Sequence, residues 1–116
     1  MFEDVTVSAL HTALSGLSLR QRVIADNISN VETPGYQARR VQFEDALKNA
    51  VGAGDSPDSV SPTIAKSLEP TRENGNNVNL DTETLSNIDT NLRFQLGLRA
   101  VDNKFALLKD AIKGGA

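Results

Sequence analysis

The chain has 116 residues, which is enough for one modest domain but too short for two separate hydrophobic cores. Its 12 basic and 15 acidic residues give a net charge of −3, and the basic residues are scattered, which argues against a nucleic-acid-binding surface. The absence of cysteine excludes disulfide bonds and thiolate metal sites, and the lack of tryptophan leaves mainly aliphatic side chains to form a core.

The first predicted element is a helix from about residue 4 to residue 31. Its apolar side chains recur in alternating steps of four and three, which is the spacing of a heptad seam. They are Leu10, Leu14, Leu17, Ile24, Ile28 and Val31, with Gln21 in the one polar slot. At 1.5 Å per residue the helix would be about 40 Å long. A chain of this size cannot cover such a helix alone, so we expect it to pack against other helices.

Gly16 lies in the middle of this predicted helix, where glycine costs about 1 kcal/mol relative to alanine. Two interpretations stay open. The glycine is either simply tolerated beside Ser15 and Ser18, or it allows another helix to approach closely.

The helix is predicted to end at a turn formed by Thr33, Pro34, Gly35 and Tyr36. Proline sets φ near −65°, and glycine supplies the positive φ that a type II turn requires. Asn30 is placed to close the last helical turn. Asn27 lies three residues earlier on the same side of the helix, and its amide is a candidate for hydrogen bonds to the Tyr36 segment or to a neighbouring subunit.

Residues 37–80 are predicted to connect two long helices. Residues 37–42 look extended or irregular, and a short helix follows over about residues 43–51, before Gly52. Residues 52–77 are rich in Pro, Ser, Asp and Asn and contain no aromatic residue. This segment cannot bury enough apolar surface to order itself, so we expect a flexible loop, with a plain linker as the favoured interpretation.

A second long helix is predicted from about residue 81 to residue 113, with Asp81 or Thr82 as its cap. It carries two apolar stripes and therefore requires two neighbours. One stripe consists of Leu85, Ile88, Leu92 and Leu96, and the other of Phe94, Leu98, Val101, Phe105, Leu108 and Ile112. One face can pair with the first helix, but nothing in the chain is left to cover the other. Exposed apolar surface of this extent indicates a partner site.

No catalytic or ligand-binding site is predicted. His11 is the one histidine, and no second histidine or cysteine exists to complete a metal site. The glycines at residues 52–54 and 75 lack the lysine and the strand of a phosphate-binding loop. We therefore expect no cofactor, no metal, no small-molecule substrate and no enzymatic activity.

The predicted fold is all-α, with two long terminal helices forming an antiparallel, coiled-coil-like hairpin, a short third helix and a flexible middle loop. One domain is expected, divided into residues 1–36, 37–80 and 81–116. The predicted assembly interface consists of Leu10, Leu14, Leu17, Ile24, Ile28, Leu98, Val101, Phe105, Leu108 and Ile112. The predicted motif turn consists of Asn27, Asn30, Thr33, Pro34, Gly35 and Tyr36.

Residues 25–36 read Ala-Asp-Asn-Ile-Ser-Asn-Val-Glu-Thr-Pro-Gly-Tyr. This order resembles the signature A-x-N-I-x-N-x-x-T-P-G-Y of the flagellar axial proteins of bacteria. Residues 14–22 are similar to the first helix of that family. Residues 73–81 and 104–109, together with the short chain, look like its basal-body rod members.

The resemblance implies a structural subunit of the proximal rod of the flagellar basal body, which polymerises through its terminal helices and transmits torque from the membrane ring to the hook. The implied partners are copies of itself, other rod proteins, the membrane ring protein and the rod-base adaptor. Export into the periplasmic rod through the flagellar type III apparatus is also implied, and the acidic N-terminus is unlike a cleaved signal peptide. A cytoplasmic helical-hairpin adaptor or export chaperone is the alternative, because it would use the same helices.

Overall fold

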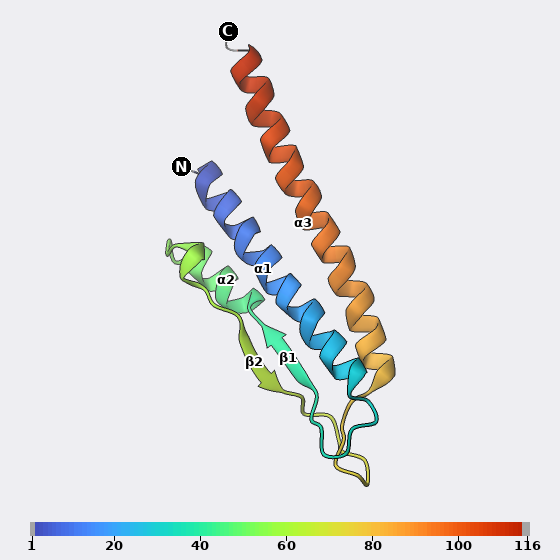
Figure 1. Ribbon diagram of the computed structural model, residues 1–116. Helices are drawn as coiled ribbons and strands as arrows, with labels where there is room; N and C mark the ends of the chain where they lie inside the picture. The colour runs from blue at the N-terminus through green and yellow to red at the C-terminus, as the bar shows by residue number, and fades with distance from the viewer. Residues whose placement is uncertain (1, 115–116) are drawn as a thin grey trace.

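The computed structural model describes the backbone of residues 2–114 and the side chains of residues 5–107, 109, 110 and 113. Helix α1 spans Phe2–Ser29 and helix α3 spans Leu80–Gly114. The two helices run antiparallel side by side in an elongated molecule of 67 × 26 × 14 Å, and the chain ends lie toward the same end (Figure 1). The predicted hairpin of terminal helices is therefore confirmed.

Helix α3 packs against α1 through the side that carries Thr90 and Gly97. Thr90 is fully buried, and next to it Gln21 of α1 donates from Nε2 to Oδ1 of Asn91 over 2.7 Å. A Cβ atom added to Gly97 would lie 2.8 Å from Cδ2 of Leu14, so this glycine allows the two helices to approach closely. Leu14 precedes Gln21 along α1, whereas its partner Gly97 follows Asn91 along α3. This reversed order is what an antiparallel pair of helices requires.

The connecting segment contains more regular structure than predicted. It forms strand β1 (Arg39–Gln42), helix α2 (Glu44–Gly52), a 3-10 turn η1 (Pro57–Ser59) and strand β2 (Thr63–Lys66). The strands pair antiparallel, with Arg39 opposite Lys66 and Gln42 opposite Thr63. The short third helix is confirmed. The prediction of a plain linker over residues 52–77 is wrong, because η1 and β2 lie within it.

Hydrogen bonds, rather than buried apolar side chains, hold this segment in place. The strand ladder joins β2 to β1, while Thr12 of α1 donates from Oγ1 to the Pro57 carbonyl over 3.2 Å and Ser8 donates to Asp58 over 2.7 Å. Leu68, in contrast, is 98% exposed. The linker prediction failed because it counted only the apolar surface available for burial and left out backbone pairing.

The hydrophobic core is small and lies between α1, β1 and the start of α2. Its buried side chains are Leu17, Val23, Val41 and Phe43, with Ala13, Leu19 and Phe94 packed against them. A Cβ atom on Gly16 would lie only 2.5 Å from Cδ1 of Phe43. Gly16 is therefore more than tolerated, but the group that approaches it closely is the Phe43 ring and not the backbone of another helix, as the second interpretation had it.

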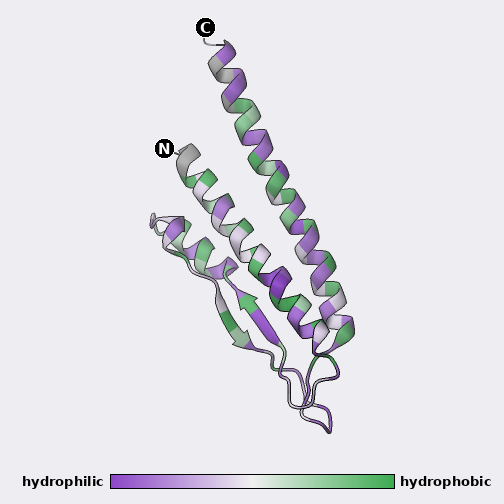
Figure 2. Ribbon diagram, in the orientation of Figure 1, coloured by the Kyte–Doolittle hydropathy of each residue, from purple (hydrophilic) through white to green (hydrophobic). Residues whose placement is uncertain are grey.

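Hydrophobic and hydrophilic residues alternate along the part of α3 that Figure 2 colours by hydropathy. The helix is capped by Asn79, whose Oδ1 accepts a hydrogen bond from the Thr82 amide over 3.2 Å, and not by Asp81 or Thr82 as predicted.

Within residues 2–114, no helix is both long enough and apolar enough to span a membrane.

Candidate functional site: an asparagine-linked turn and an uncovered helix face

The turn after α1 adopts the conformation that its residues predict. Gly35 has φ of +75°, and the Tyr36 amide donates to the Thr33 carbonyl over 3.2 Å, as in a type II turn with proline before glycine. Asn30 ends α1 by donating from Nδ2 to the Asp26 carbonyl over 2.8 Å. Its own Oδ1 accepts from the Thr33 hydroxyl over 3.0 Å. No non-glycine residue in the described part of the chain has positive φ, so Asn30 closes the helix without a left-handed backbone.

Asn27 joins the end of α1 to the segment that leaves the turn. Its side chain is completely buried. Nδ2 donates to the Arg39 carbonyl over 2.9 Å, while Oδ1 accepts from the Arg39 amide and from the Tyr36 hydroxyl, each over 3.1 Å. The contact expected between Asn27 and the Tyr36 segment is therefore present. The Asn27 side chain also occupies the edge of β1 that faces away from β2.

A second buried asparagine, Asn76, joins the loop before α3 to the motif turn. Its Nδ2 donates to the carbonyls of Asn30 and Thr33, each over 2.8 Å, and its Oδ1 accepts from the Val78 amide over 2.8 Å. A backbone bond from the Gly35 amide to the Asn74 carbonyl, 2.8 Å long, supports the same junction. The ends of the two long helices are thus linked through side-chain amides.

The third buried asparagine, Asn77, binds the two sides of the strand pair. Its Oδ1 accepts from the Ala38 amide over 2.6 Å, and its Nδ2 donates to the carbonyls of Ser67 and Glu69 over 3.3 and 3.1 Å. We call Asn27, Asn76 and Asn77 the asparagine clasp. Asn76 and Asn77 were not among the residues predicted from the sequence, although a cluster of asparagines between loop and helix is a signal for side-chain bonds to backbone.

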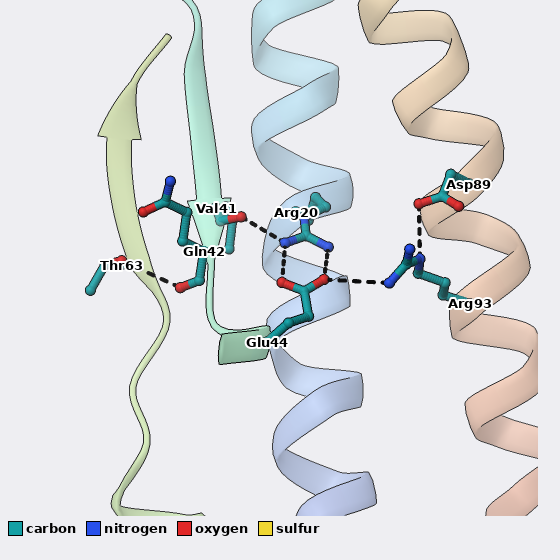
Figure 3. Close-up of polar contacts among 7 residues, drawn as sticks. All are labelled: Arg20, Val41, Gln42, Glu44, Thr63, Asp89 and Arg93. Atoms are coloured by element: carbon teal, nitrogen blue, oxygen red, sulfur yellow. Dashed lines mark hydrogen bonds and ion pairs between the residues drawn. The ribbon is translucent and has the colours of Figure 1, made fainter. Parts of the chain in front are cut away.

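An ionic network connects the middle of α1 to α2 and α3 (Figure 3). Arg20 binds the Glu44 carboxylate with two nitrogens, over 2.5 and 2.6 Å, and donates to the Val41 carbonyl over 2.7 Å. Arg93 of α3 lies 3.8 Å from the same carboxylate and 2.9 Å from Asp89. The Arg20 guanidinium also lies over the Phe43 ring, 5.0 Å from its centroid. The network fixes α2 against α1 beside the core.

The hydrogen bonds from Arg20 lower the pKa of the Glu44 carboxyl, although its partial burial acts in the opposite direction. The groove beside this pair is lined by α1, β1 and α3 and contains both arginines and carboxylates, so it has no single charge that would select a ligand. No cluster of histidine, cysteine and acidic residues in the described part of the chain could hold a metal ion. The network is structural in character.

The predicted interface residues of α1 are mostly occupied within the chain. Leu17 and Ile24 are buried, while Leu10, Leu14 and Ile28 are partly buried. On α3, Val101 is partly buried, and Leu98 and Phe105 remain 44% and 56% exposed. The side chains of Leu108 and Ile112 lie outside the described residues.

The apolar side chains of the other stripe of α3 are all more than half exposed. We call Leu85, Ile88, Leu92 and Leu96 the outer stripe; they are 68%, 61%, 58% and 57% exposed. With 3.6 residues per turn, Ile88 and Leu92 lie nearly opposite Thr90, and Thr90 is buried against the rest of the chain. In the described part of the chain the Thr90 hydroxyl has no hydrogen-bond partner. Helix α3 therefore turns a partly polar side inward and an apolar side outward.

Comparison with known proteins places this architecture in a family. The family described as "Flagella basal body rod protein" matches residues 8–37, which include the motif turn. The chain is 30% identical to the flagellar basal body rod protein FlgB of Bacillus subtilis, over 95% of each chain. The chain belongs to the flagellar basal body rod protein family. It is also 29% identical to the FlgB protein of Escherichia coli, over 97% of this chain and 96% of that one.

Membership in the rod protein family gives the chain a structural role in the flagellar basal body rod, where it assembles with other rod proteins. It is a structural protein and not an enzyme. The alternative of a cytoplasmic adaptor or export chaperone, which the helices alone left open, is thereby set aside. Two structural features of the chain can be explained by assembly into a rod. They are the motif turn, which the asparagine clasp holds in place, and the uncovered outer stripe of α3.

Proposed function

We propose that the chain is a subunit of the proximal rod that polymerises through its terminal helices and transmits torque from the membrane ring to the hook. The observation that carries this proposal is the outer stripe of α3. Four aliphatic side chains, each more than half exposed, lie in a row on a helix whose opposite side is already buried. An exposed apolar row of this kind marks a surface for another subunit, because burial of apolar area on association is favourable.

The assembly surface is proposed to combine the outer stripe with the exposed part of the second stripe. Leu98 and Phe105 flank the side of α3 that packs on α1, and both keep about half of their surface free. Leu10, Leu14 and Ile28 of α1 contribute at the margins, because each is only partly buried. Leu17 and Ile24 act from inside the subunit by holding the helix that supports this surface.

The motif turn is proposed to make the subunit rigid at the end where the two long helices meet. Torque applied to one helix reaches the other through their direct packing and through the connection between them. The asparagine clasp provides that connection with hydrogen bonds to backbone atoms, which hold a fixed geometry more strictly than apolar contacts do. Thr33, Pro34 and Gly35 are themselves exposed, so this turn also offers a surface to a neighbouring subunit.

Copies of the chain, other rod proteins, the membrane ring protein and the rod-base adaptor are the proposed partners. Passage through the flagellar type III apparatus in an unfolded state is the proposed route to the periplasmic rod. The small core supports that route, because only a few large apolar side chains are buried among the described residues and the isolated subunit gains little free energy from burial.

The proposal is tested by Leu92→Asp, which places a charge at the centre of the outer stripe. We expect the variant to be exported normally but to be absent from purified basal bodies, with loss of motility. Asn91→Asp is the matched control: it adds the same charge one residue away and keeps the oxygen that accepts from Gln21. Leu98→Asp tests the flank of the surface in the same assay. Normal incorporation and motility of Leu92→Asp would contradict the proposal.

A further inference from the structure

The outer stripe is bordered by one free charge at each end, and the two charges are opposite. Asp81 precedes Leu85, and Arg99 follows Leu96. Both side chains are exposed, and among the described residues neither takes part in an ion pair. With 3.6 residues per turn, Asp81 and Arg99 lie on the same side of α3 as Ile88 and Leu92. The stripe thus runs from an acidic end to a basic end.

This order is complementary to itself when two copies of α3 lie antiparallel. If the helices cross midway between Ile88 and Leu92, Ile88 of one copy meets Leu92 of the other and Leu85 meets Leu96. Asp81 of each copy then meets Arg99 of the other. In the parallel orientation, Asp81 would meet Asp81 and Arg99 would meet Arg99, and like charges at such positions are unfavourable.

We propose that, before incorporation, the subunit covers its outer stripe by pairing α3 antiparallel with the same stripe of a second copy. The inference rests on the proposed function, since it concerns the state of the same surface in the free protein. The four aliphatic side chains supply the attraction. The two exposed ion pairs add little free energy and instead set the orientation.

A pair of this kind is isologous and closed, so it cannot grow into a filament. It must open before the stripe can contact a neighbour in the rod. Self-pairing therefore protects the apolar surface from premature or incorrect association. Asp89, which lies close to the two-fold axis of the pair, is already neutralised by Arg93 at 2.9 Å, so its approach to its own copy carries little repulsion.

The first test is a charge exchange, read as molar mass by sedimentation equilibrium over a range of micromolar concentrations. We expect the unmodified chain to be a dimer and both Asp81→Arg and Arg99→Asp to dimerise more weakly, because each reversal places two pairs of like charges opposite one another. An equimolar mixture of the two variants should regain the dimer, because each ion pair is restored between unlike chains. This recovery separates a lost interface from a misfolded variant. Asn91→Asp should stay dimeric.

The second test uses the absence of cysteine from the chain. Leu85→Cys mixed with Leu96→Cys should form a disulfide-linked heterodimer on oxidation, in clear excess over the homodimer of either variant. Efficient self-linking of Leu85→Cys would indicate parallel pairing and overturn the proposal. A chain that stays monomeric at every concentration would also overturn it. If the chain is monomeric but Leu92→Asp fails to enter the rod, the proposed function is still supported. Normal incorporation of Leu92→Asp would contradict the proposed function, whatever the molar mass of the free chain.

Discussion

Asn27 pairs with the backbone of Arg39 as a neighbouring β-strand would. The side-chain amide donates to the Arg39 carbonyl over 2.9 Å and accepts from the Arg39 amide over 3.1 Å. A residue of α1 thereby forms hydrogen bonds with both backbone groups of Arg39, on the edge of β1 that faces away from β2. Further along the same edge, Arg20 donates to the Val41 carbonyl over 2.7 Å. Strand β1 therefore lies between β2 on one side and α1 side chains on the other, with no edge open to another strand.

Replacing Asn27 by Asp should destabilise the subunit by about 1–3 kcal/mol, because a buried carbonyl loses its donor. A carboxylate can still accept from the Arg39 amide and the Tyr36 hydroxyl, but it cannot donate to the Arg39 carbonyl. Chemical denaturation followed by circular dichroism measures the change. Asn91→Asp is the control, since exposed Asn91 uses only its oxygen and should unfold like the unmodified chain. Equal stability of both variants would show that the donated bond is unimportant.

Gly16→Ala should lower the free energy of unfolding, against the usual preference of helices for alanine. The added Cβ would lie 2.5 Å from Cδ1 of Phe43, whose ring is buried. Overpacking of this kind costs about 1–3 kcal/mol, more than the roughly 1 kcal/mol that alanine gains over glycine in a helix.

Gly52→Ala is the control for this substitution, because nothing lies within 4 Å of its added Cβ at the end of α2. Thermal unfolding should show a lower midpoint for Gly16→Ala and an unchanged or slightly higher one for Gly52→Ala. Adding Phe43→Leu to Gly16→Ala should recover part of the loss, since the smaller side chain frees the space. A raised midpoint for Gly16→Ala alone would contradict the close contact with the ring.

Stability should depend on pH through Glu44. The pKa of this carboxyl is lowered in the folded protein by its hydrogen bonds to Arg20, so its contribution is present above the ordinary glutamate pKa. That contribution disappears as the pH falls through the lower pKa of the folded state. The free-energy difference between the unmodified chain and Glu44→Gln should therefore be largest above about pH 5 and should shrink below the usual glutamate pKa of about 4.3.

The effect will be modest, because the Glu44 side chain is 41% exposed to solvent. Asp45→Asn is the matched control: it removes a carboxylate from the same first turn of α2 but from a residue without an ion pair in the described structure. Denaturation curves at several pH values compare the three proteins. A difference between the unmodified chain and Glu44→Gln that does not change with pH would contradict the assigned role of the carboxylate.

Heptad spacing predicted the two long helices, but it could not decide which side of α3 faces α1. The outer stripe is a row of four aliphatic side chains, yet the structure leaves it exposed and turns the side of Thr90 and Gly97 inward. Gly97 allows the two helices to approach closely, and Gln21 pairs with Asn91 beside Thr90. Close approach and polar pairing depend on both helices at once, so the period of one helix does not reveal them.

The strand pair escaped prediction for a different reason. Arg39–Gln42 and Thr63–Lys66 are four residues each and carry no strong alternation of apolar and polar side chains. Their pairing is fixed from outside, by Asn27 on one edge and by Asn77 at one end. The turn at Pro34 and Gly35 was predictable, because those two residues carry their backbone preferences with them. The contact of Asn27 with the Tyr36 segment was also predicted, whereas the partners of Asn76 and Asn77 are distant in sequence and are set only in the folded chain.

Alanine at Gly75 should destabilise the subunit more than alanine at Gly35. Both glycines have positive φ, +83° and +75°, and a left-handed backbone costs a non-glycine residue about 1–2 kcal/mol. A Cβ on Gly35 would meet nothing within 4 Å, whereas a Cβ on Gly75 would lie 3.3 Å from the Gly35 Cα. The second substitution therefore also pushes apart the two loops that Asn76 holds together. Thermal midpoints should fall in the order unmodified, Gly35→Ala, Gly75→Ala. Equal midpoints for the two variants would mean that the loops can separate without cost, and the clasp would then not be the rigid connection between α1 and α3.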